Sequence, residues 1–300
     1  MVHAERVGER RALAVAMGVL DSCLVELGRP EEATHMAQVL DLYEELGDQL
    51  YVAITLGNLG AVSLFESKWA QAADYYMRSA EAGKKAGDLT IAAIAHANLA
   101  EVRVNQGRLE EAEALLVPAV RTLESFEYLI AAALATLQLA RTRVFLGNYD
   151  AGLAMLQAAT NTLDDASVLI GSIEARARLV EVSTFAGDAE RAAQALAEAR
   201  ELGGTPLATL LDRVEVTLAA TAGDPRSTAI RLEQAVARAR DDGAKYDLLL
   251  LLELADRIGL EADAREREEL ASELGVVRFV ALPERLASAD PSGSAISLTT

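Results

Sequence analysis

The chain has 300 residues, of which 51% are hydrophobic, only 4% are aromatic and one is cysteine, and its net charge is −18. So large an acidic excess excludes a surface for nucleic-acid phosphates, which requires clustered Lys and Arg. No window of about 20 residues lacks charged side chains, which excludes a membrane span. The single cysteine, Cys23, excludes an internal disulfide and fits a reducing, cytoplasmic location; we expect it to be a small core residue.

The first residues, 1–10, are polar, and we expect them to be frayed. From residue 11 onward the chain repeats one layout, which the stretch 56–88 shows most clearly: two amphipathic helices joined by a turn at Ser67. The layout returns every 36 to 40 residues, with turns at Gly28, Ser67, Gly107, Gly147, Gly187, Gly223 and Gly259. A fixed period of this size predicts stacked helical hairpins.

Each second helix has small side chains at fixed distances from its turn. Five residues after the turn stand Ala33, Ala72, Ala112, Gly152, Ala192, Thr228 and Ala264. Nine residues after it stand Ala37, Tyr76, Leu116, Leu156, Leu196, Leu232 and Glu268. We expect the small residues to allow a close crossing of the two helices and the large ones to fill the space beside it.

This pattern resembles the tetratricopeptide repeat (TPR), whose first helix carries Leu-Gly and whose second carries Ala, an aromatic residue and Ala. Leu59-Gly60, Ala72 and Tyr76 match it well, whereas the first-helix Tyr of the family is replaced here, for example by Ser63. The resemblance covers 11–275. It implies an all-α, right-handed superhelical α-solenoid of about seven helix-turn-helix repeats.

The usual repeat of the family has 34 residues, so each hairpin here is about six longer, and we expect the extra residues in joins such as 86–88. Repeats of this longer type resemble the C-terminal arrays of bacterial LuxR-type and adenylate-cyclase-like ATPase regulators. That resemblance implies a piece of a larger signalling protein.

The C-terminal part departs from the repeat. The final helix, about 261–274, is highly charged, as a solvated cap should be. A short apolar segment follows, and we expect a capping segment over 276–287 that packs back on the last helix. Residues 288–300 are rich in Ser, Gly and Pro, and we expect disorder.

Chemistry-bearing motifs are missing. The three histidines, His3, His35 and His96, belong to different hairpins, and there is no HExxH, CxxC, GxxxxGK[ST] or GxSxG. We therefore expect no catalytic residues, no metal site, no cofactor and no enzymatic activity.

One polar and aromatic set recurs on the first helices at positions that would line the concave face of a solenoid. This inner ladder comprises Asn58, Asn98, Gln138, Arg178, Glu101, Arg141, Glu181, Phe65, Asn105, Phe145 and Phe185. Amide side chains offer both a donor and an acceptor and can hold a peptide backbone. The same residues could instead bond within the stack, so a binding role and a scaffold role both stay open.

We expect a non-enzymatic regulatory module of a bacterial signal-transduction or transcription-regulatory protein. It would bind a partner protein, or another domain of a larger parent chain, but neither nucleic acid nor a membrane. The alternative is a receptor whose concave groove binds a peptide or small effector. Whether it forms a homo-oligomer is left open.

Overall fold

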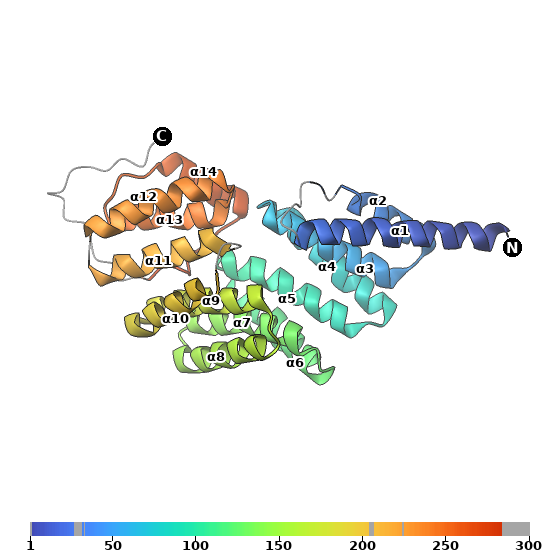
Figure 1. Ribbon diagram of the computed structural model, residues 1–300, viewed down its shortest axis with the longest axis horizontal. Helices are drawn as coiled ribbons and strands as arrows, with labels where there is room; N and C mark the ends of the chain where they lie inside the picture. The colour runs from blue at the N-terminus through green and yellow to red at the C-terminus, as the bar shows by residue number, and fades with distance from the viewer. Residues whose placement is uncertain (1, 27–31, 33, 204–206, 224, 284–300) are drawn as a thin grey trace.

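The computed structural model describes residues 2–26, 32, 34–203, 207–223 and 225–283. Over these residues the chain forms fourteen α-helices, which follow one another as seven hairpins (Figure 1). The all-α solenoid of about seven helix-turn-helix repeats is therefore confirmed. None of the described helices combines the length and the apolar character that crossing a membrane requires.

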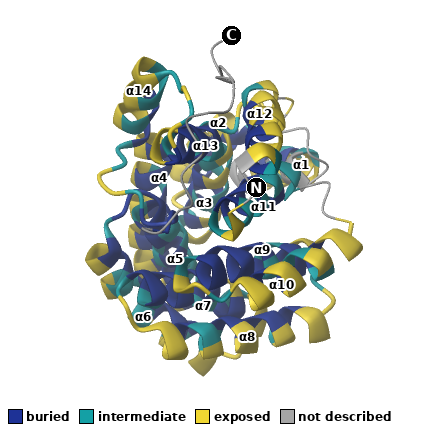
Figure 2. Cartoon of the chain, turned by 90° about the vertical axis from the view of Figure 1, so that its left-hand side faces the viewer, coloured by how far each residue is buried: buried dark blue, intermediate teal, exposed yellow. Residues whose placement is uncertain are grey.

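The first helices of the hairpins form an inner layer, because each contacts the first helix of the next hairpin. They are α1 (Val2–Glu26), α3 (Gln49–Phe65), α5 (Leu89–Asn105), α7 (Leu129–Phe145), α9 (Leu169–Ala186), α11 (Ala208–Ala222) and α13 (Lys245–Arg257). The second helices form an outer layer. They are α2 (Met36–Leu46), α4 (Trp69–Ala86), α6 (Leu109–Ser125), α8 (Tyr149–Asp165), α10 (Ala189–Glu201), α12 (Pro225–Asp241) and α14 (Ala264–Leu274). Figure 2 shows the buried residues concentrated on α5, α7 and α9 and the exposed ones on the outer faces of α8 and α10.

The expected hairpin turns adopt the left-handed conformation that ends a helix. Gly107, Gly147 and Gly187 have φ of 80°, 91° and 82°, values that cost glycine little. Ser67, another expected turn, and Glu127, in the join between α6 and α7, adopt φ of 60° although they lack the conformational freedom of glycine. The expected turn at Gly28 lies outside the described residues.

The helix register read from the sequence holds in the central hairpins. Ala72 and Ala112 are fully buried. A Cβ added to Gly152 would lie 2.5 Å from the Val144 side chain, so α7 and α8 cross too closely for a larger residue. The register fails in α14, whose Ala264 is exposed because this helix is the solvated cap.

The extra residues of the long repeat lengthen the helices, so the prediction that they lie in the joins is wrong. Helices α5 to α8 each have 17 residues. The join at 86–88 reduces to the two residues between α4 and α5. High helix propensity of the Ala- and Leu-rich sequence explains why the added residues continue the helix.

One expectation near the N-terminus differs from the structure. Helix α1 begins at Val2, and the expectation that residues 1–10 are frayed stays a prediction. Cys23 is exposed, contrary to its expected core position. The buried residue of this turn is Asp21, which accepts a hydrogen bond from His35 N at 2.6 Å, and Cys23 lies about 200° further round the helix.

The C-terminal segment does not remain on the last helix. Its described part runs from Gly275 across to the turn between α5 and α6, where Val277 N donates to Gln106 O at 2.9 Å. Residues 284–287 and the expected disordered tail, 288–300, lie outside the described residues. We call 275–283 the C-terminal strap.

The strap and α13 bring the end of the chain against its second and third hairpins. Gln106 Nε2 donates to Leu274 O at 2.9 Å, and the rings of Trp69 and Tyr246 lie 5.0 Å apart. Figure 1 shows the same return of α13 and α14 toward α4. We call this contact between the two ends of the superhelix the seam.

Candidate ligand-binding site

Buried charges connect the inner helices from α7 to α13. Glu181 accepts from Arg141 Nε at 2.7 Å and from Arg213 Nη2 at 2.8 Å, and Arg213 Nε donates to Asp247 Oδ1 at 2.6 Å. Arg141, Arg213 and Glu181 have side chains no more than 1% exposed. Arg141 also donates to Asn105 on α5, so one chain of charged and polar groups crosses five first helices.

The surroundings of Glu181 favour its charged form. Burial by itself would raise the pKa of this carboxyl, but Arg141, Arg213 and Arg178 outweigh burial and lower the pKa to about 2. The carboxylate is therefore ionised under all ordinary conditions. It is the anion that holds α7, α9 and α11 together at the centre of the inner layer.

The surroundings of Glu101, in contrast, favour its neutral form. Burial and the neighbouring Glu174 carboxylate raise the pKa of Glu101, against the attraction of Arg178. Arg178 lies 3.6 Å from Glu101, 3.3 Å from Glu174 and 3.7 Å from Glu181, so a single guanidinium serves three carboxylates. Glu101 is thus the least compensated carboxylate of the inner layer, and it opens onto two cavities.

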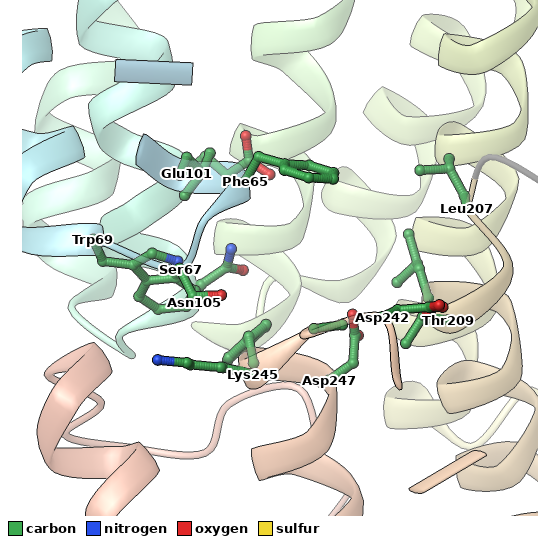
Figure 3. A pocket seen from close by; sticks show the side chains of 14 residues that line it. Phe65, Ser67, Trp69, Glu101, Asn105, Leu207, Thr209, Asp242, Lys245 and Asp247 are labelled. Atoms are coloured by element: carbon green, nitrogen blue, oxygen red, sulfur yellow. The ribbon is translucent and has the colours of Figure 1, made fainter. Parts of the chain in front are cut away.

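The larger cavity, the seam pocket, has a volume of about 430 Å³ and lies between the two ends of the superhelix (Figure 3). Phe65, Glu101 and Asn105 line it from α3 and α5, and Thr209 and Asp247 line it from α11 and α13. A ligand in this pocket would therefore contact hairpins that are far apart in the sequence.

Trp69 from α4 and Tyr246 from α13 both line the seam pocket, and their rings are in contact across the seam. Burial raises the pKa of the Tyr246 hydroxyl to about 12, so this group stays a neutral hydrogen-bond donor. Asp242 accepts from Thr209 Oγ1 at 2.7 Å, and Lys245 is the only cation among the lining residues described. The pocket combines aromatic surface with an excess of carboxylates.

The smaller cavity, about 160 Å³, lies along the groove between α5 and α7. Asn98, Glu101 and Gln138 line it, together with apolar residues such as Ile94 and Leu134. Glu101 lines both cavities, so they are neighbouring parts of one concave surface.

The structure divides the inner ladder into four groups. Glu101, Asn105, Phe65, Asn98 and Gln138 line the two cavities.

Arg141, Arg178 and Glu181 belong to the buried network. Phe145 and Phe185 contact each other with ring centroids 5.2 Å apart. Asn58 is partly buried on α3 and lines neither cavity. Only the part of the ladder that lines the two cavities therefore forms a continuous surface.

Sequence reasoning missed the opposite wall of the seam pocket. Thr209, Asp242, Lys245 and Asp247 line it, and Arg213 supports it from the network. They belong to hairpins whose spacing drops from 40 to 36 residues, so they fall out of the register that identified the ladder. The sequence feature that could have identified this wall is the alternation of Arg with Glu or Asp on successive first helices.

Comparison with protein-family models found no match, and comparison with curated proteins found none either. Among solved structures, the chain is similar to a Rap protein complexed with competence and sporulation factor. The TM-score is 0.63 at 13% identity, and the match covers 86% of this chain and 71% of the Rap chain. The fold is therefore a TPR-like helical repeat.

Proposed function

We propose that this chain is a non-enzymatic regulatory receptor that binds a short peptide segment in the seam pocket. The observation that carries the proposal is a 430 Å³ cavity built by the two ends of one superhelix, with aromatic, amide and carboxylate side chains around it. Cavities of this size and mixed polarity are typical ligand sites. The Rap protein of the same fold was solved in complex with a factor, which supports a receptor role.

The charge of the pocket favours a cationic ligand group. Three carboxylates, those of Glu101, Asp242 and Asp247, line the pocket with a single lining cation, Lys245, and the whole chain carries −18. Arg178 and Arg213 behind the lining neutralise Glu101 and Asp247 only in part. An Arg or Lys side chain, or a free amino terminus, would gain from carboxylates and aromatic rings together. A ligand rich in acidic residues would be repelled both during approach and in the pocket.

The proposal also includes the kind of protein to which this chain belongs. The long repeats resemble those of bacterial LuxR-type and adenylate-cyclase-like regulators, which supports a module of a larger cytoplasmic signal-transduction protein. The acidic surface supports a protein or peptide partner rather than nucleic acid.

Peptide pools test this function. Random hexapeptide pools with one position fixed as Arg are compared with pools fixed as Glu, and the emission of Trp69, the only tryptophan, reports occupancy of the pocket. We expect the Arg pools to change the emission and the Glu pools to leave it unchanged. Asp242→Lys should abolish the response. Asp241→Lys should retain it, since Asp241 is exposed and does not line the pocket. Equal responses of the two variants, or no response to any pool, would refute the proposal.

A second function, docking of a partner protein, is supported by an exposed apolar edge. The first residues of α5, α7 and α9 are Leu89, Leu129 and Leu169, with 53%, 61% and 54% of their surface exposed. Such a row at one edge is typical of an interaction surface. A photo-crosslinker at position 129 should give a defined adduct in native cells, whereas one at exposed Ile230 on α12 should not. Equal labelling at both positions would contradict this role.

A further inference from the structure

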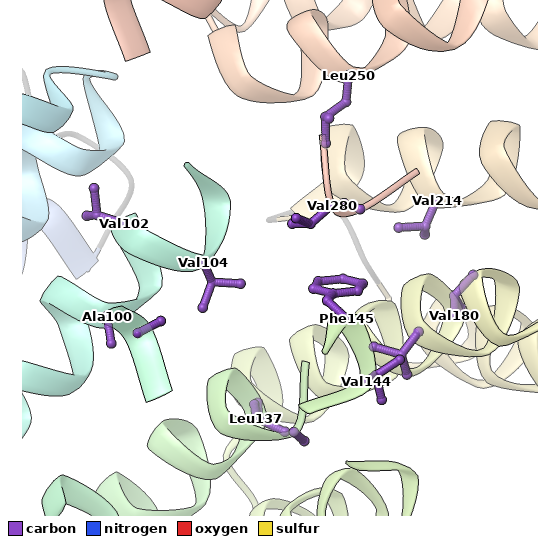
Figure 4. Packing of buried hydrophobic residues seen from close by; sticks show 14 of the residues in the cluster. Ala100, Val102, Val104, Leu137, Val144, Phe145, Val180, Val214, Leu250 and Val280 are labelled. Carbon is purple, nitrogen blue, oxygen red and sulfur yellow. The ribbon is translucent and has the colours of Figure 1, made fainter. Parts of the chain in front are cut away.

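The C-terminal strap closes the superhelix next to the seam pocket. Val277 N and Leu274 O bond the backbone and side chain of Gln106, the residue that follows Asn105 in the pocket lining. Beyond this point Val280, Ala281 and Leu282 are buried. Figure 4 shows Val280 between Leu250 and Phe145, with Val214 to one side. The strap therefore contacts both walls of the seam.

Gly107 makes this docking sterically possible. A Cβ at Gly107 would lie 2.4 Å from Arg278 O, a distance no side chain can accept without displacement of the strap backbone. Gly187 has the same conformation, with φ of 82° against 80°, and a Cβ there would meet nothing within 4 Å. A Cβ would therefore collide with the strap at Gly107 but not at Gly187.

The strap can leave without unwinding the helix that carries it. Gly275 ends α14 with φ of 66°, and the bonds from Gly275 N to Ser272 O and from Val276 N to Ala271 O close the helix by themselves. One docking contact is the hydrogen bond from Val277 N to the backbone oxygen of the buried Gln106, while Gln106 Nε2 holds Leu274 O, the carbonyl of α14 just before the strap. Water can replace the bond to Val277 when the strap leaves, so undocking leaves no polar group without a hydrogen-bond partner.

We propose that the C-terminal strap, 275–283, gates the seam pocket: docked on the α5–α6 turn it holds the two ends of the superhelix together, and its release opens the pocket. That the gate controls access of a ligand rests on the proposed function, whereas docking and release of the strap need no ligand. A ligand that bridges Glu101 on one wall and Asp247 on the other stabilises the docked strap, because both favour the closed seam.

The test uses the full chain without ligand. Gly107→Ala is compared with Gly187→Ala, which introduces the same backbone strain at a turn where the added Cβ meets nothing within 4 Å. We expect Gly107→Ala to speed amide hydrogen exchange over 276–283 about tenfold and to raise acrylamide quenching of Trp69 about twofold. Gly187→Ala should match the natural chain in both measurements.

Equal behaviour of the two variants would overturn the gate. If Gly107→Ala does not fold, Gln106→Ala decides, since it removes the bond to Leu274 and should change both measurements in the same direction. The exchange and quenching measurements use no peptide, so their outcome is independent of the experiment with the peptide pools. A strap that opens in a chain that binds no pool refutes the receptor role alone, and a strap that stays fixed in a chain that binds the Arg pool refutes the gate alone.

Discussion

Replacement of Glu181 by Gln keeps the size of the side chain and removes the charge that Arg141 and Arg213 share. The pKa of Glu181 is lowered from 4.5 to about 2, and at 1.36 kcal/mol per unit this corresponds to about 3 kcal/mol of interaction in the folded chain. Loss of one partner from a buried ion pair costs about 3–5 kcal/mol, so the two values agree. We expect urea unfolding at pH 7 to show a loss of about 3–5 kcal/mol.

A matched control is Glu113→Gln. Glu113 on α6 pairs with Arg143 on α7 at 3.4 Å, but both side chains are about a third exposed, and such pairs contribute at most about 1 kcal/mol. A similar loss in both variants would refute the reasoning, since burial would then not decide the cost.

The difference between Glu181→Gln and the natural chain should depend on pH. A carboxyl with a depressed pKa stabilises the folded state above its ordinary value of 4.5, and that stabilisation disappears as the pH falls toward about 2. We therefore expect the difference in unfolding free energy to fall to about half or less at pH 3. A difference that is constant from pH 7 to pH 3 would show that lost packing, rather than charge, explains the effect.

Two further predictions concern stability, both measured by urea or thermal unfolding. Ala112→Leu should over-pack the crossing of α5 and α6 and cost about 1–3 kcal/mol, whereas Ala114→Leu, at an exposed position of the same helix, should not; an unchanged unfolding transition for Ala112→Leu would refute the register. Glu127→Gly should stabilise the chain by up to about 1 kcal/mol, because Glu127 adopts a left-handed conformation at φ 60° that only glycine adopts without strain, and Glu127→Ala should bring no such gain.

Local patterns were sufficient to predict the hairpins. Gly60 illustrates why: a Cβ there would lie 2.5 Å from the ring of Tyr76, and the Leu-Gly and Tyr positions of the repeat encode that contact directly. Such contacts join residues of one hairpin, whose spacing is visible in the sequence. The helix count and the alternation of inner and outer helices follow from repetition of the same unit.

The closing of the superhelix could not be predicted in this way. Trp69 directly follows the turn of the second hairpin, yet its ring contacts Tyr246 in the last hairpin of the array. That contact depends on the sum of small rotations between successive hairpins, which no single repeat encodes. The seam pocket and the docking of Val277 on Gln106 arise from the same sum.

The closing also explains why most of the inner ladder bonds to itself. In an open groove Arg141, Arg178 and Glu181 would be solvated and free to hold a ligand, whereas here they are buried among the inner helices. Two ion pairs of the network each link a helix to the next hairpin, from Arg141 to Glu181 and from Glu181 to Arg213. Apolar contacts tolerate sliding of one hairpin over the next, but a hydrogen-bonded ion pair fixes both distance and angle. We infer that this network sets the rotation between hairpins, and that the ends of the superhelix meet at the seam because that rotation is fixed.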